Sequence, residues 1–135
     1  MKRHGDRSPQ ALRDLRQAEI SLGAGLFEWA CFAAQQAAEK AVKALYEYLG
    51  GEGWGHTISK LLKELPEEYK PPDVLLRAAA DLDKLYIPTR YPNGFEQGYP
   101  GEFFHEENAR EALEKARQIV HYVQEKIEGG ISSNG

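Results

Sequence analysis

The sequence has 135 residues, of which 41% are hydrophobic and 28% charged, and a formal net charge of −4. This length fits one domain that buries a core without disulfides or metals. No uncharged apolar run approaches the roughly 20 residues that a membrane span needs, and no apolar segment follows the charged N-terminus as it would in a secretion signal. We therefore expect a single cytoplasmic domain over residues 1–135 that binds neither membranes nor, because it is acidic, double-stranded DNA.

The spacing of apolar residues predicts a helix near the start of the chain. Ser8 followed by Pro9 is typical of a helix start, and the first helix is expected to run from there to about residue 22. Its apolar spacing predicts one buried stripe. The stripe consists of Leu12, Leu15, Ala18 and Leu22.

The next segment, Trp29 to Leu49, contains no glycine or proline and carries alanine on most of its circumference. A helix with so wide an apolar surface must be enclosed by other helices. Cys31 lies inside it and is expected to be a buried small hydrophobe. Its polar exceptions recur every three or four positions, which predicts one narrow line that faces water, a partner or a site. They are Gln36, Glu39, Lys40, Lys43 and Glu47.

Three further segments complete the prediction. A short helix capped by Thr57 or Ser59 runs to about residue 65, and prolines make residues 66–72 a linker. Helices are expected over 73–86, with Val74 and Leu75 facing the core, and over 106–128, separated by a loop at 87–104. Residues 1–7 and 129–135 are expected to be flexible. The fold class is all-α, an antiparallel four-helix up-and-down bundle with one additional short helix.

The loop at 87–104 is the chemical candidate, because aromatic rings gather in and beside it around Arg90. Rings beside a cation suit the stacking of a nucleobase and the binding of its phosphate. The alternative is that the rings cover one end of the bundle and that Arg90 pairs with Asp81 or Asp83. Among the histidines, His4 and His121 are expected on the surface, whereas His56 and His105 suit acid/base chemistry or phosphate contact. No metal motif or phosphate-binding glycine motif occurs, so we expect no metal and no cofactor.

Taken together, these segments resemble the HEPN (higher eukaryotes and prokaryotes nucleotide-binding) domain. The similarity rests on FAAQQAAEKAVKALYEYLG at 32–50, HTISKLLKEL at 56–65 and LDKLYIPTRYP at 82–92, and covers nearly the whole chain. The resemblance implies a helical bundle that forms homodimers and acts in nucleotide or RNA chemistry. Small stand-alone members resemble partners of minimal nucleotidyltransferases, often in toxin and antitoxin modules.

Many HEPN domains are metal-independent ribonucleases in which an arginine is followed, after four to six residues, by a histidine. Arg90 is the matching arginine, but the three positions in that window hold Phe95, Glu96 and Gln97. The usual acid/base partner is therefore missing. The resemblance still implies that Arg90 and Tyr91 form a patch that faces the ligand.

We accordingly predict a non-catalytic module that binds nucleotide or RNA. Its ligand-binding residues are Arg90, Tyr91, Tyr86, His56 and Lys43. One alternative is a metal-independent endoribonuclease with an unusual arrangement of Arg90 and His56 or His105. The other is a module that binds only another protein.

Overall fold

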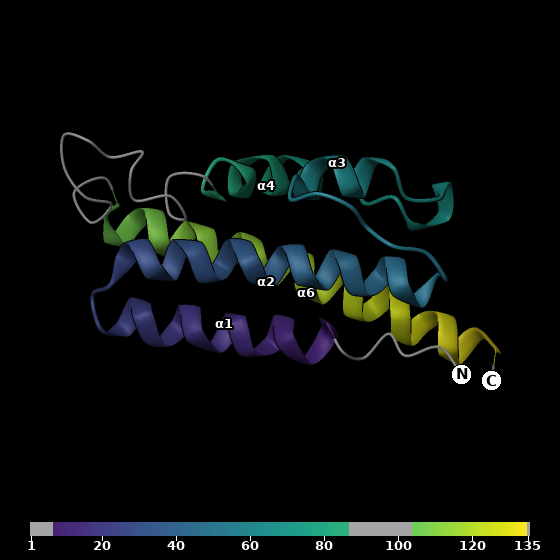
Figure 1. Ribbon diagram of the computed structural model, residues 1–135, viewed down its shortest axis with the longest axis horizontal. Coiled ribbons are helices and arrows are strands. Elements are labelled where there is room, and N and C mark those ends of the chain that lie inside the picture. The colour runs from purple at the N-terminus through teal and green to yellow at the C-terminus, as the bar shows by residue number, and fades with distance from the viewer. Residues whose placement is uncertain (1–6, 87–103, 135) are drawn as a thin grey trace.

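The computed structural model describes residues 7–86 and 104–134. Figure 1 shows that successive long helices run in alternating directions, with the short helix α3 set beside α4. The bundle is the predicted all-α fold, and no β-strand occurs in the described ranges. The long helices are α1 (Arg7–Gly23), α2 (Phe27–Tyr48), α4 (Asp73–Asp83) and α6 (Glu106–Asn134); α3 (Ile58–Lys63) and a 3-10 turn, η1 (Glu67–Tyr69), lie between α2 and α4.

Helix α2 is the centre of the bundle, as its alanine content predicts. It packs against α1 and α6 along its length and also contacts α3 and α4. Alanines 30, 34, 37, 38 and 44 are completely buried, and so is Cys31. Because methyl side chains add little thickness, neighbouring helix axes approach α2 closely. Within the described part of the chain, no helix is long and apolar enough to cross a membrane.

The predicted buried stripes of α1 and α4 are each wrong at their first residue. Ala11 is fully buried, whereas Leu12 is 47% exposed. Consecutive helical residues point about 100° apart, so the smaller neighbour Ala11 faces the core and Leu12 faces outward. In α4, Leu75 is likewise buried, whereas its neighbour Val74 is exposed.

Helix ends also differ from the prediction. The prolines do exclude an α-helix from residues 66–72, but the Tyr69 N–H donates to the Pro66 carbonyl at 2.8 Å and closes the η1 turn. Helix α4 ends at Asp83, three residues before the expected end. Helix α6 continues through Gly129 to Asn134, where the sequence predicts a flexible tail.

Candidate functional site

The chain between α2 and α3 returns along α2 instead of leaving it. Gly50 has a φ of 90°, which reverses the chain. At Gly53 an added Cβ would lie 3.3 Å from side-chain atoms of Lys43, Tyr46 and Leu61, so any other residue would have to displace these neighbours slightly. The return places His56 beside Glu39 in the middle of α2, with 2.8 Å between Nδ1 and Oε2.

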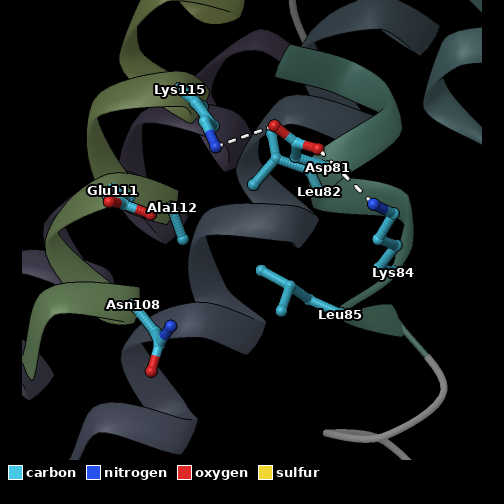
Figure 2. A pocket seen from close by; sticks show the side chains of 8 residues that line it. All are labelled: Asp81, Leu82, Lys84, Leu85, Asn108, Glu111, Ala112 and Lys115. Atoms are coloured by element: carbon cyan, nitrogen blue, oxygen red, sulfur yellow. Dashed lines mark hydrogen bonds and ion pairs between the residues drawn. The ribbon is translucent and has the colours of Figure 1, made fainter. Parts of the chain in front are cut away.

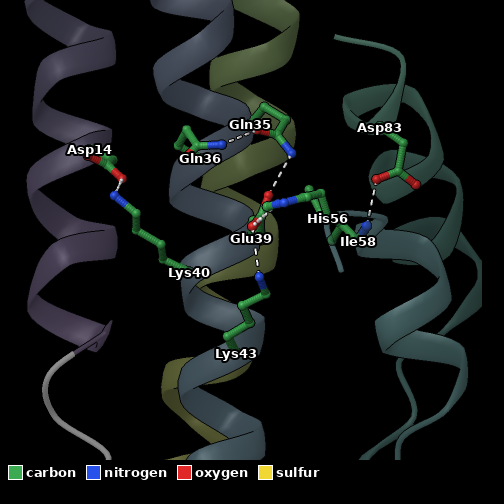
Figure 3. Close-up of polar contacts among 9 residues, drawn as sticks. All are labelled: Asp14, Gln35, Gln36, Glu39, Lys40, Lys43, His56, Ile58 and Asp83. Carbon is green, nitrogen blue, oxygen red and sulfur yellow. Dashed lines mark hydrogen bonds and ion pairs between the residues drawn. The ribbon is translucent and has the colours of Figure 1, made fainter. Parts of the chain in front are cut away.

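Glu39 is the centre of a polar network inside an apolar helix (Figure 3). Its side chain is only 7% exposed. The Lys43 ammonium donates to Oε2 at 2.9 Å, and the Gln35 amide donates to Oε1 at 3.1 Å. Gln35 in turn accepts a hydrogen bond of 2.7 Å from Gln36. The carboxylate therefore has donors from α2 on both oxygens and holds His56 as a third partner.

These contacts determine the charge of Glu39. Its burial by itself raises the pKa of the carboxyl group. The hydrogen bonds from Lys43, His56 and Gln35, together with the lysine charge, outweigh burial and bring the pKa below its ordinary value. Glu39 is consequently an ionised acceptor that fixes the orientation of the His56 ring.

Tyr86 completes the site from the other side. Its ring stacks on the His56 ring with centroids 4.6 Å apart and an interplanar angle of 15°. Trp54, two residues before His56, is 80% exposed. We call Gln35, Glu39, Lys43, His56 and Tyr86, with Trp54 beside them, the His56 site.

Asp83 joins the segments that carry the two stacked rings. Its carboxylate accepts hydrogen bonds from the Ile58 N–H at 2.6 Å and the Ser59 N–H at 3.1 Å, and from the Ser59 hydroxyl at 2.7 Å. Asp83 thus caps α3 from the end of α4. The predicted caps are wrong, because Thr57 makes no capping hydrogen bond and Ser59 donates to Asp83.

Three predicted ligand-binding residues are therefore brought together: His56, Lys43 and Tyr86. Arg90 and Tyr91 lie outside the described residues. His105 is exposed and precedes α6, where its backbone N–H donates to the Asn108 side chain at 2.9 Å.

Gln35 is not among the residues that the sequence predicts for the site, although Gln35, Glu39 and Lys43 follow one another at four-residue intervals, which places them on one face of the helix. The predicted polar line is not a single line. Lys40 points away from Glu39 and pairs with Asp14 of α1 at 2.8 Å (Figure 3).

A pocket apart from the His56 site lies between α4 and α6 (Figure 2). The Lys115 ammonium lies 2.8 Å and the Lys84 ammonium 3.7 Å from the Asp81 carboxylate. The hydrogen bond from Lys115 is the main reason why the pKa of Asp81 is below its ordinary value. Asp81 and the acid Glu111 together offset the charges of the two lysines, and the described lining contains no aromatic ring, so this pocket suits a nucleotide less well than the stacked rings of the His56 site do.

Cys31 has a structural role in α2. Burial, helped by the charge of Glu28, raises the pKa of the Cys31 thiol to about 12, so it remains an unreactive thiol at neutral pH. This confirms its predicted role as a buried small side chain. The described residues include no group of three or more potential metal ligands.

Comparison with known proteins assigns the family. The family model for the HEPN domain matches residues 6–127. The chain belongs to the HEPN domain family. It is similar to the crystal structure of TT1696 from Thermus thermophilus, with 48% identity, a TM-score of 0.88, and coverage of 93% of this chain and 99% of that one.

Two further crystal structures agree with this HEPN assignment. An archaeal HEPN homologue has 42% identity and a TM-score of 0.79, covering 94% of this chain and 99% of its own. A HEPN domain protein from Thermotoga maritima has 30% identity and a TM-score of 0.74, covering 90% and 97%. No curated protein matches the chain.

Proposed function

We propose that this HEPN domain binds nucleotides or single-stranded RNA at the His56 site and does not cleave RNA by itself. The observation that carries the proposal is the stack of His56 on Tyr86, held from behind by the ionised Glu39. Aromatic faces bind bases of any sequence, and a cation nearby contacts phosphate. Trp54 offers a second exposed ring, and Arg90 follows Tyr86 by four residues in the chain.

The partner proposals follow from the family. We propose a homodimer that works with a separate minimal nucleotidyltransferase in a toxin and antitoxin module. The missing histidine after Arg90 supports a binding role within such a pair.

The test is a gel shift with short single-stranded RNA in EDTA, read for both binding and cleavage. Tyr86→Leu, Trp54→Leu and Arg90→Ala should each weaken binding, by about 5- to 150-fold where a base stack of roughly 1–3 kcal/mol is lost. His121→Ala is the control, because His121 is exposed on α6 and pairs with Glu125. Equal binding by the three variants and the wild type would contradict the proposal.

One contact favours a ribonuclease as the second candidate. A carboxylate that orients a histidine is a common acid/base arrangement, and Glu39 holds Nδ1 of His56 in this way. Metal-independent cleavage that disappears in both His56→Ala and Arg90→Ala would establish this function. If the wild type neither shifts nor cleaves RNA, the third candidate, a module for protein interaction, takes first place.

A further inference from the structure

The outer face of α1 carries apolar side chains that the bundle does not cover. Leu12 and Ile20 are exposed, the latter by 55%, although isoleucine is among the residues most often buried. Arg13 and Arg16 lie on the same face and line one shallow surface with them. The two exposed apolar side chains therefore flank two cations along the helix.

This face is positively charged although the protein is acidic. Glu19, on the edge of the face, pairs with Arg117 of α6 at 2.8 Å. Asp14 is occupied by Lys40. Among the described residues, neither Arg13 nor Arg16 has an acidic partner. Within the described ranges, the face therefore carries two positive charges without an ion pair, on a chain whose formal net charge is −4.

A groove between α1 and α2 continues this surface. Gln17 lines both the outer face and the groove. The groove has a volume of about 340 Å³, and its lining includes Leu26 and Trp29, which is 53% exposed. We define the α1 face as Leu12, Arg13, Arg16, Ile20, Leu26 and Trp29.

We infer that the α1 face is a docking site for an acidic amphipathic helix of a partner protein. Such a helix lays apolar side chains, spaced three and four residues apart, into a groove between two helices. Glutamates or aspartates beside its apolar stripe would meet Arg13 and Arg16, which are themselves three residues apart on α1. This surface is separate from the His56 site, so the inference does not depend on the proposed function.

Charge argues against two other occupants. A two-fold contact of this face with a second copy would bring arginines towards arginines, which repel. An anionic membrane is attracted by clusters of several cations, whereas the α1 face has two, Arg13 and Arg16, with the acidic Glu19 at its edge. An acidic amphipathic helix would cover the exposed apolar side chains of the face and would also pair with its two arginines.

The probe is a labelled helical peptide of about 18 residues with leucines on one stripe and glutamates beside them, compared with a twin that carries lysines instead. Fluorescence anisotropy gives the dissociation constants of the wild type, of Arg13→Glu/Arg16→Glu, and of Ile20→Asp. The matched control is Lys60→Glu/Lys63→Glu, which makes the same change in charge at two exposed positions three residues apart on α3.

We expect the wild type to bind the acidic peptide at least about tenfold more tightly than the basic twin. Arg13→Glu/Arg16→Glu should reverse this preference, Ile20→Asp should weaken both peptides, and the control should behave as the wild type. Equal binding of the two peptides, or an equal loss in the control, overturns the inference. A wild-type dimer that Arg13→Glu/Arg16→Glu converts to monomer, or binding to phosphatidylserine vesicles without peptide binding, overturns it in favour of a second copy or a membrane.

Discussion

Glu39 is the residue on which the His56 site depends, and its burial makes its partners interdependent. Lys43 is 9% exposed and has Glu39 as its ion-pair partner. Removing one member of a buried pair leaves the other charge in a poorly solvated place, which costs about 3–5 kcal/mol. Replacing both members with apolar side chains avoids most of that cost.

We therefore predict that Glu39→Ala lowers the free energy of unfolding by about 3–5 kcal/mol. The double variant Glu39→Ala/Lys43→Met should lose clearly less than the single variant, because no lysine charge remains buried. Urea unfolding followed by circular dichroism measures both. A loss in the double variant as large as that in Glu39→Ala would show that the buried lysine charge is not the source of the cost.

The network around Glu39 also marks the limit of what the sequence predicts. Enclosure of α2 follows from its alanines, since a helix that is apolar on most sides cannot be on the surface. The pairing of Glu39 with His56 links residues 17 positions apart and depends on the return of the chain at Gly50 and Gly53. The apolar periodicity of a single helix does not show where the chain turns back. The sequence therefore predicts Lys43 and His56 as site residues but not their link through Glu39.

The register of α1 was ambiguous for a different reason. Ala11 and Leu12 are both apolar and adjacent, so either of them continues a stripe with Leu15 and Ala18. The packing of α1 against the bundle decides the register, because it buries Ala11 completely and leaves Leu12 exposed. From the apolar pattern alone, the larger side chain, Leu12, is predicted to be the buried one.

Helix α3 depends on α4 for its start. It has six residues, which is too short for a helix to be stable by itself. Asp83 accepts hydrogen bonds from the backbone N–H groups of Ile58 and Ser59, which have no partner within α3. The same contact sets the distance between the segments that carry His56 and Tyr86.

Loss of this cap should cost stability and loosen the stacked rings. We predict that Asp83→Ala lowers the free energy of unfolding by about 1–2 kcal/mol and speeds hydrogen exchange at the Ile58 and Ser59 amides. Thr57→Ala is the matched control, because Thr57 makes no capping hydrogen bond. If the control has the same effect as Asp83→Ala, α3 is not capped from α4.

The helices of the bundle are joined by apolar contacts and by polar links. Helices α1, α2 and α6 meet through buried apolar side chains, with ion pairs of Asp14 to Lys40 and of Glu19 to Arg117 between them. Polar links also connect α3 and α4 to α2 and α6. Glu39 holds the segment before α3, Asp81 joins α4 to Lys115 of α6, and the Tyr46 hydroxyl donates to the Leu61 carbonyl at 2.6 Å.

Two of these links require an ionised carboxylate, so acid should weaken the attachment of α3 and α4. The pKa values of Glu39 and Asp81 are lower in the folded protein than their ordinary values of 4.5 and 3.8. A carboxyl group whose pKa is lowered by folding stabilises the fold above its unfolded pKa, and this contribution is lost as pH falls through the folded pKa. Stability should thus be level above about pH 5 and decline progressively below about pH 4.5.

Glu39→Gln/Asp81→Asn separates this effect from the general acid sensitivity of proteins. The double variant should be less stable than the wild type at pH 7, because two charged acceptors are gone, but its melting temperature should decline less steeply between about pH 5 and about pH 3. Asp73→Asn/Glu67→Gln is the control, since it removes two exposed carboxylates whose ion pairs, to Arg77 and Lys70, are 3.6 Å long. If the melting temperature of the double variant falls as steeply with pH as that of the control, the acid-sensitive groups lie elsewhere. A shallower fall in the double variant than in the control assigns the attachment of α3 and α4 to Glu39 and Asp81.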